Sequence, residues 1–439
     1  MENKILGAGD DTFDSNNTTA SQTLNSGDVL DGSGGTDRLA IVSSLTGGGT
    51  LGAGVQTKSV EQLSVNAVTA TTVDAATMAG VTDVYNNASL SAVTVTGLTA
   101  IANVHVLNTN ANTTAIFNAD AVAGLADATT VLLNGAATTG NNSVTVNGIE
   151  TINLVAAGTA SGSATTNTTV TSNALTTLNV TGVGAVVSAG LPGATATVTG
   201  TVTSDAGAHD VAITGVVAAD KLSVSMNAGN DTVRISDIAA THTINGGDGT
   251  DTLVSTVAIT TTTGANISGF EAVSAGAVAV ALPTGNLINA VTFTGTGGSV
   301  STVLSGATVS QAATGTNTVS NTAWTTGTAD ALTLNVGSAT VGGAIAAGLT
   351  AEGIESLAIN NSTLSTDTTS ARVLTVTQAT STLKSAIVSG TQPTTLTAAQ
   401  TTLTSVNAEG VSGGFTFTSA STAGASVTGG AGNDVLTGG

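Results

Sequence analysis

A nine-residue motif at residues 429–437 constrains the fold of this chain more than any other feature. It reads Gly-Gly-x-Gly-x-Asp-x-Leu-x, and diluted copies of it surround Asp11, Asp37, Asp231 and Asp251. The glycines allow a tight backbone turn that brings carbonyl oxygens to a cation, and the Asp adds a hard carboxylate oxygen. Oxygen-only ligation in a Gly-rich loop suits Ca²⁺ better than zinc or copper. The apolar residue two positions after the Asp is expected to point inward as a strand begins, so the motif predicts a calcium-binding turn that starts a strand.

The charge of the chain argues against two classes of partner. Its 27 acidic and 7 basic residues give a net charge of −20, which disfavours binding to nucleic acids and to anionic membrane surfaces. The acids cluster in residues 10–37 and 205–251, whereas we assign scattered acids such as Asp74 and Asp127 to solubility. The chain has no Cys and only 3 His, which leaves no disulfide and no thiolate metal site. No conventional signal peptide and no apolar run of about 20 residues is visible, so we expect a soluble protein without a transmembrane segment.

Alternating residue types indicate an all-β fold. Segments 91–95, 178–181 and 332–336 alternate apolar and polar residues, or nearly so, as half-buried strands do. Because aromatic residues make up only 2% of the sequence, the chain cannot fill a thick globular interior at normal packing density. Small β-branched residues can fill the thin interior of a parallel β-helix or β-roll, in which short strands stack coil upon coil. We therefore predict a parallel β-solenoid, with a β-sandwich as the alternative.

Two kinds of landmark recur in the same order and indicate an internal duplication. The first is the calcium-type turn, and the second is a small residue, an apolar residue, Glu, any residue and an apolar residue. The Glu of the second landmark is Glu61, Glu150, Glu271 or Glu355. Equivalent landmarks lie about 210 residues apart. The predicted organisation is a first unit of calcium turns and solenoid over residues 1–220, a second over residues 221–427, and the start of a third turn at residues 428–439.

The Glu motif has two interpretations. A Glu between two apolar neighbours can face solvent or accept backbone N–H groups at a coil corner. It can also ligate calcium or contact a neighbouring subunit. We favour the first interpretation.

A single nonapeptide supplies only part of a calcium coordination sphere. Because Ca²⁺ takes about six to eight oxygens, turns must pair across successive strands. Asp28 and Asp37 lie nine residues apart in the same register, as two successive half-coils. Asp231 and Asp251 are 20 residues apart, close to one full coil of about 18 residues. His242 stands nine residues before Asp251, where a half-coil keeps its shape without the Asp, and we interpret it as structural. The candidate metal ligands are Gly9, Asp11, Asp28, Gly35, Asp37, Gly229, Asp231, Gly249, Asp251, Gly432 and Asp434.

These turns predict that calcium binding and folding are coupled. Without the cation, clustered carboxylates repel one another and Gly-rich turns are costly to order. With it, a site that exists only in the folded state converts binding free energy into folding free energy. Extracellular modules of this kind bind Ca²⁺ with a Kd of roughly 10⁻⁴–10⁻³ M. Such a chain would stay unfolded in a calcium-poor cytosol and fold after export.

At these residues the chain resembles the RTX proteins, the calcium-binding, type I-secreted proteins of Gram-negative bacteria. Segment 27–37, the turns at Asp231 and Asp251 followed by segment 269–271, and the background of Thr, Ala, Val and Gly resemble the lattice-forming region of calcium-dependent RTX S-layer proteins. The resemblance implies export through a type I channel and calcium-driven assembly of a two-dimensional lattice on the bacterial cell surface. It implies further copies of the chain and an outer-membrane polysaccharide as partners. It also implies that the matching Gly and Asp positions ligate calcium.

Two rival function classes are open. An RTX enzyme would need a catalytic motif, but the zinc protease motif His-Glu-x-x-His is absent. Segment 410–414 matches Gly-x-Ser-x-Gly around Ser412, but no helix is evident after it and no His lies downstream to complete a triad, so we predict no enzymatic activity. A secreted adhesin or an extracellular matrix fibre built from the same repeats is the alternative. Adhesins usually show many near-identical short modules, whereas two diverged long units favour a lattice protein.

Overall fold

A computed structural model describes residues 3–134, 142–157, 168–182, 186–190, 199–214, 221–337, 344–361 and 370–438. Apart from two short 3-10 helices, η1 (Ala119–Val122) and η2 (Thr322–Thr325), the regular elements in these ranges are β-strands. Strands pair in parallel with those of the next coil, which confirms the predicted parallel β-solenoid over the β-sandwich alternative. The chain divides into two compact units, Met1–Val233 with Thr241–Thr243 and Arg234–Ala240 with Ile244–Gly439.

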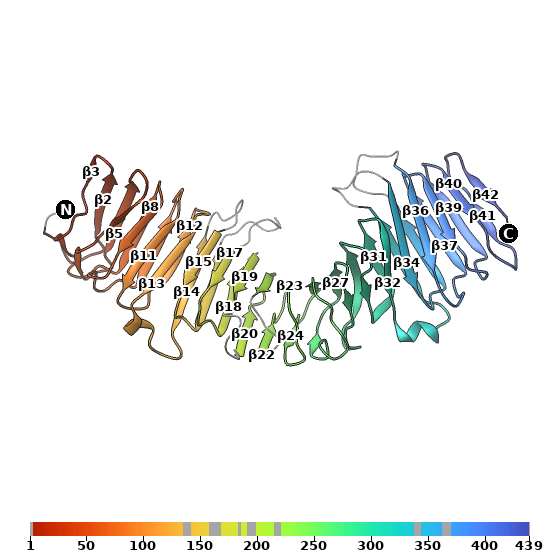
Figure 1. The fold of residues 1–439 in the computed structure, drawn as a ribbon, viewed down its shortest axis with the longest axis horizontal. Helices are drawn as coiled ribbons and strands as arrows, with labels where there is room; N and C mark the ends of the chain where they lie inside the picture. The colour runs from red at the N-terminus through yellow and green to blue at the C-terminus, as the bar shows by residue number, and fades with distance from the viewer. Residues whose placement is uncertain are drawn as a thin grey trace. The chain divides into compact units, whose positions relative to one another are not determined.

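In the first unit, stacked coils build three sheets (Figure 1). The first sheet contains, in order, β2 (Thr12–Thr18), β5 (Arg38–Ser44), β8 (Gln62–Ala67), β10 (Asp83–Asn87), β12 (Asn103–Leu107), β14 (Ala128–Asn134), β16 (Thr151–Ala157), β18 (Thr177–Gly182), β20 (Thr199–Ser204) and β22 (Lys221–Ser225), with β3 (Ser21–Gln22) antiparallel beside β2. The second contains β6 (Gly49–Leu51), β9 (Thr71–Asp74), β11 (Val93–Leu98), β13 (Thr113–Phe117), β15 (Asn142–Val146), β17 (Thr168–Thr171), β19 (Val186–Gly190) and β21 (Asp210–Thr214). A small third sheet contains β1 (Lys4–Ile5), β4 (Val29–Asp31) and β7 (Gln56–Lys58).

The second unit is built in the same way, and β23 (Thr232–Ile235) contributes residues to both units. One of its sheets contains β25 (Thr252–Ser255), β27 (Ala272–Ala275), β29 (Ile288–Phe293), β31 (Val303–Gln311), β33 (Ala331–Val336), β35 (Ser356–Asn360), β37 (Ser385–Gly390), β39 (Ser405–Val411) and β41 (Ser426–Thr428). Another contains β28 (Ala279–Val280), β30 (Ser299–Val300), β32 (Gly315–Val319), β34 (Ile345–Ala351), β36 (Arg372–Thr377), β38 (Thr394–Ala398), β40 (Phe415–Thr418) and β42 (Val435–Thr437). The pair β24 (Thr243–Asn245) and β26 (Ile267–Ser268) lies at its start.

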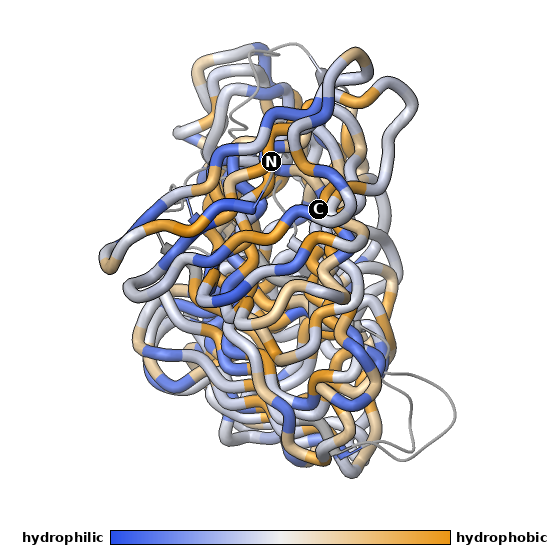
Figure 2. The backbone as a smooth tube through the Cα atoms, turned by 90° about the vertical axis from the view of Figure 1, so that its left-hand side faces the viewer, coloured by the Kyte–Doolittle hydropathy of each residue, from blue (hydrophilic) through white to orange (hydrophobic). Residues whose placement is uncertain are grey.

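The core is a thin column of apolar side chains inside the coils. In β16, Ile152 and Leu154 are fully buried, whereas the intervening Asn153 lies partly exposed on the outer face. Leu154 stands in register between Val131 of β14 and Val180 of β18, and all three are 0% exposed. The same alternation appears in Figure 2 as short hydrophobic and hydrophilic stretches along the chain. Small aliphatic residues therefore make up most of the interior, as the composition predicted, and the few aromatic residues such as Phe13 and Trp324 are buried among them.

The length of a coil varies, which differs from the predicted coil of about 18 residues. Ala272 pairs with Ala290, 18 residues further along the chain. Gly315 pairs with Ala347, which is 32 residues further along. Only the strands must keep register with the coils on either side, so the connections between strands absorb the additional residues.

The register of the core generates a stability prediction. Leu154→Ala should lower the free energy of unfolding by about 2–5 kcal/mol, because it leaves a cavity between two coils that cannot close around it. The neighbouring Val155 is partly exposed on the outer face. Val155→Ala should therefore change the free energy of unfolding by less than about 1 kcal/mol. Urea denaturation followed by circular dichroism measures both. Equal losses for the two variants would contradict the observed inward and outward assignment.

Candidate metal centre

Two of the three N-terminal turns with predicted ligands, those of Asp11 and Asp37, lie on neighbouring coils. Asp11 directly precedes β2, and Asp37 directly precedes β5. These strands pair in parallel, with Thr12 opposite Arg38. The register places the two Asp residues side by side, and the Asp11 N–H donates to Asp37 Oδ1 over 2.8 Å. The fold therefore brings these two predicted ligands together.

Asp37 is the most constrained of the predicted ligands. Its side chain is 0% exposed, and one oxygen, Oδ1, accepts the Asp11 N–H. The other oxygen, Oδ2, is buried and makes no hydrogen bond within the described part of the chain. A Cβ atom on Gly32 would collide with this carboxylate. The absence of a side chain at Gly32 therefore allows the Asp37 carboxylate to pack against the turn. Burying a carboxylate oxygen without a donor is costly, and a cation at Oδ2 would remove that cost. The residues present fit an oxygen-ligated cation.

The glycine two positions before the Asp has its own structural role. Gly35 has a φ of +123°, and a Cβ there would collide with the carbonyl oxygen of Gly9 in the preceding coil. Gly229 has a φ of +129°, and a Cβ there would lie 2.5 Å from the carbonyl oxygen of Gly207. Only glycine combines this left-handed conformation with such close backbone approach. The predicted ligands Gly9, Gly35 and Gly229 thus lie where the turns of successive coils touch.

Asp28 lies elsewhere on its coil. It directly precedes β4, which belongs to the small third sheet, whereas β5 belongs to the first. The two half-coils predicted from the nine-residue spacing to Asp37 therefore exist, but they form different faces. Asp28 Oδ2 accepts the Asn25 N–H over 2.9 Å and so closes its own turn. Within the described ranges, no group of three or more His, Cys, Asp or Glu side chains is arranged to hold a metal, so a cation would also need backbone carbonyl oxygens.

Asp231 forms the same contact as Asp37. It directly precedes β23 and is 1% exposed. Its Oδ1 accepts the N–H of His209, a residue of the preceding coil, over 2.7 Å. Burial lowers the pKa of His209, but the hydrogen bond and charge of Asp231 and the charge of Asp205 outweigh it, so this pKa lies above its usual value. Asp231 thus links two coils within the first unit.

The two predicted turns of the second unit repeat parts of this arrangement. Asp251 directly precedes β25 and is 0% exposed, and Gly249 before it has a φ of +145°. Asp434 directly precedes β42, and its Oδ1 accepts the Phe415 N–H over 2.7 Å. A Cβ on Gly432 would collide with the backbone N of Gly414. Both turns thus place a carboxylate at the start of a strand.

The apolar residue two positions after the Asp points inward in five of the six turns, as predicted. Those that follow Asp11, Asp28, Asp37, Asp231 and Asp251 are Phe13, Leu30, Leu39, Val233 and Leu253, each at most 1% exposed. Leu436 after Asp434 is in register with the buried Phe417 but remains 42% exposed. The nonapeptide therefore fixes the inward phase of the strand that it starts.

The four Glu landmarks accept backbone N–H groups, as the favoured interpretation predicted. In each, a Glu Oε2 accepts the N–H of an Asp in the preceding coil, at 2.7–2.9 Å. The Glu N–H and the next N–H both return to the carbonyl oxygen of that Asp. The four pairs are Asp37 with Glu61, Asp127 with Glu150, Asp251 with Glu271, and Asp330 with Glu355. We call these four pairs the Asp–Glu clasps.

Sequence reasoning missed two members of the clasps and one turn. Asp127 was assigned to solubility and Asp330 was not singled out, yet both occupy the clasp position held by Asp37. The sequence does contain a signal for these two residues. Each Asp stands three residues after a glycine, and its carboxylate lies where a Cβ of that glycine would be. His209 takes the Asp position in a turn of the form Gly-x-His-x-Val, which a search for Asp alone passes over. His242, interpreted as structural, is 0% exposed at the foot of β24.

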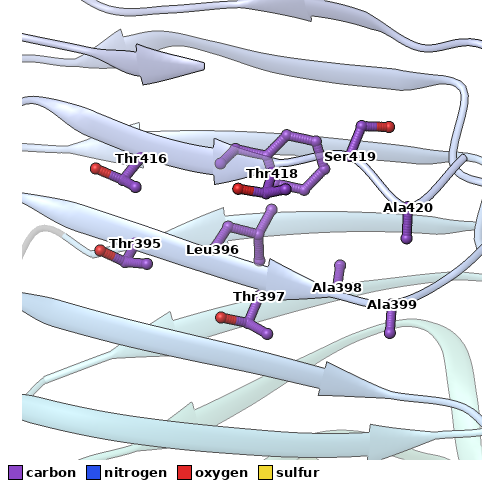
Figure 3. Close-up of a pocket in the computed structure, with 10 residues that line it drawn as sticks. Thr395, Leu396, Thr397, Ala398, Ala399, Thr416, Thr418, Ser419 and Ala420 are labelled. Carbon is purple, nitrogen blue, oxygen red and sulfur yellow. The ribbon is translucent and has the colours of Figure 1, made fainter. Parts of the chain in front are cut away.

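A hollow also lies on β38 and β40. Figure 3 shows Thr395 and Thr397 on one strand and Thr416 and Thr418 on the neighbouring strand. The remaining lining residues are Ala, Leu, Phe and Ser. Because no charged group lines it, the hollow supplies no hard-oxygen carboxylate for a cation.

The sequence matches no protein-family model and no curated protein. In the described ranges, no helix has the length and apolar character needed to cross a bilayer. The function is therefore argued from the solenoid and its turns.

The clasps generate one prediction. Glu61→Ala should lower the free energy of unfolding by about 1–2 kcal/mol, because the Asp37 N–H loses a charged acceptor. Glu61→Gln retains an acceptor oxygen and should recover part of the loss. Glu409 lies outside the motif and is exposed, so Glu409→Ala is the matched control, and chemical denaturation is the measurement. A loss at Glu409 as large as that at Glu61 would argue against the clasp.

The glycine contact generates another. Gly35→Ala should destabilise the first unit by more than about 1 kcal/mol, because the new Cβ meets the Gly9 carbonyl at a positive φ. At Gly34 a Cβ would meet nothing within 4 Å, so Gly34→Ala should be nearly neutral. Thermal unfolding of both variants at the same calcium concentration tests this. A Gly34 variant as unstable as the Gly35 variant would rule out the close approach as the cause.

Proposed function

We propose that the chain is a structural protein of a bacterial surface layer that folds on binding Ca²⁺ and self-assembles into a two-dimensional lattice. The calcium ligands are the Asp carboxylates and Gly carbonyls of the turns before the strands. A β-solenoid supports a structural role because it is a repetitive scaffold in which each coil contacts only its neighbours. The resemblance to RTX S-layer proteins supports export by type I secretion and an extracellular location.

One observation carries the calcium part of the proposal. Asp37 Oδ2 is buried at the contact between two Gly-rich turns and has no hydrogen-bond donor among the described residues. The basic residue next to it, Arg38, directs Nε and Nη2 to Gln62 Oε1 at 2.8 and 2.6 Å. This guanidinium is thereby engaged on the outer face of the sheet. A hard divalent cation supplies the missing positive charge and accepts further carbonyl oxygens from the turns.

The Asp–Glu clasps also bring negative charges together and so favour a bound cation. The contacts from Asp11 to Asp37 and from Asp37 to Glu61 place acids on three successive coils. In a chain with a net charge of −20, closing this stack without a counter-ion works against electrostatic repulsion. Calcium binding would therefore drive the coils together, and the same step would order the surface from which a lattice is built.

Calcium-dependent folding and assembly test this function together. Raising Ca²⁺ from chelator to about 10 mM, well above the affinity of extracellular modules, should produce β-structure by circular dichroism and planar arrays by negative-stain microscopy. Folding without arrays, with fibres or monomers that bind glycans, would favour the alternative, a secreted adhesin or matrix fibre. A spectrum unmoved by Ca²⁺, with no ion bound, would overturn the calcium role.

Asp37 provides the sharpest variant for the calcium part. Asp37→Asn keeps an oxygen for the Asp11 N–H but removes the charge, so the calcium concentration at half-folding should rise about tenfold, or about 1.4 kcal/mol. Asp14 is exposed on the outer face of β2, and Asp14→Asn removes the same charge as a control. A calcium titration followed by circular dichroism gives both midpoints. Equal shifts would mean that net charge alone, and not ligation at Asp37, sets the response.

A further inference from the structure

One outer face of the second unit differs from the other long faces in its charge. It belongs to the sheet that contains β28, β30, β32, β34, β36, β38, β40 and β42 (Figure 1). Among the described residues of these strands the one charged residue is Arg372, which is 0% exposed and therefore lies inside the coil. We call the outward side of this sheet the neutral face.

The other long sheets carry charged side chains on their outward sides. Asp14 and Asp83 lie on the first sheet of the first unit, and Asp74 lies on the second, each at least partly exposed. In the second unit, the sheet that contains β39 carries the exposed Glu409. The neutral face therefore stands apart in a chain with 27 acidic residues and a net charge of −20.

β-Branched side chains in register cover the C-terminal part of the neutral face. Thr395 is opposite Val373 on one side and Thr416 on the other. Thr416 is in turn opposite Val435. The two Val residues are 40% and 59% exposed. Such side chains stand at regular intervals on a pleated surface, and a second sheet can pack onto them at a distance of about 10 Å.

The neutral face is large enough for a specific contact. Its eight strands average about four residues each. At about 4.8 Å between strands and about 3.3 Å per residue, they cover roughly 38 Å by roughly 14 Å, or about 500 Å². Two such faces packed together would bury roughly 1,000 Å² in total, which reaches the lower limit for a biological protein–protein interface.

We propose that the neutral face binds the same face of a second copy of the chain. The inference rests on the proposed function in that a lattice requires contacts between copies, and it names the surface that makes one of them. Copies with a net charge of −20 repel one another where their acids approach, and the core of an interface is depleted of charged residues. Because the contact joins identical surfaces, a two-fold axis relates the two copies.

The first test places a charge on the neutral face. Thr397 is exposed on β38, and Ser405 is exposed on β39 of the other sheet. Thr397→Glu should raise the dissociation constant of the calcium-loaded full-length chain at least about tenfold, or about 1.4 kcal/mol, because the contact would bury an unpaired charge. Ser405→Glu adds the same charge outside the face and should leave this constant nearly unchanged.

Sedimentation velocity over a range of protein concentrations gives the dissociation constants, and circular dichroism at the same calcium concentration confirms that both variants fold. A stronger loss of association for Thr397→Glu than for Ser405→Glu would support the inference. A wild-type chain that stays monomeric, or equal losses for the two variants, would overturn it.

The second test does not depend on how well the fold tolerates a new charge. The chain has no Cys, so a single introduced thiol reports on one position. In the Thr397→Cys variant, labelling by a maleimide should be at least about tenfold slower in concentrated than in dilute protein, because association covers the thiol. In the Ser405→Cys variant the rate should not depend on protein concentration. Equal protection at both positions, or at neither, would contradict the inference.

The two tests separate the inference from the function on which it rests. A chain that folds without calcium and forms no planar arrays, yet is protected at position 397 and not at 405, would refute the proposed function and support the contact. A chain that forms calcium-dependent arrays in which positions 397 and 405 are labelled at equal rates would support the proposed function and refute the contact.

Discussion

The structure depends on how N–H groups at or just before the start of a strand are satisfied where the chain turns into a new coil. At this corner the backbone has just left a Gly-rich turn, and a side chain of the next coil supplies the acceptor. Asp37, Asp231 and Asp434 do so through Oδ1, and the clasp glutamates do so through Oε2. Hydrogen bonds to an ionised acceptor are about twice as strong as neutral ones. A few acids can therefore hold the coils in register, even though the core side chains are mostly small and could be exchanged for one another.

The same interaction accounts for the distribution of charge. A carboxylate that links two coils lies at a corner, and the links from Asp11 to Asp37 and from Asp37 to Glu61 stack negative charge over three successive coils. At Asp37 the second oxygen of the acid meets no donor among the described residues, and the proposed calcium site rests on this oxygen. Where a glycine N–H reaches the acid, as Gly124 does to Asp127 Oδ2 at 3.1 Å, the backbone supplies that donor.

The sequence predicted the fold well because the solenoid is specified locally. Alternation in β18 and β33 gives the inward face, and the apolar residue two positions after the Asp gives its phase in five of the six turns, so both follow from a few adjacent residues. The clasp role of Glu61 was also open to prediction, since its apolar neighbours leave only the corner for its carboxylate. Asp127 was missed because its partner Glu150 lies one coil away and coil length varies, although the glycine three residues before it is a local signal. His209 was missed because a search for Asp passes over it, and only the stacking places it beside Asp231.

The core and the corners have different requirements, which explains how such a chain tolerates a diverged sequence. Exchanging Val, Ile and Leu inside the coil changes volume slightly and leaves register unaffected, whereas a corner accepts only residues that end one coil and link the next. Gly35 and Asp37 are fixed by backbone contact and by a hydrogen bond, and neither requirement involves the core. If the proposed calcium role holds, calcium dependence would be a property of single corners. Each corner could then gain or lose a ligand through one side chain, while the coils around it keep their packing.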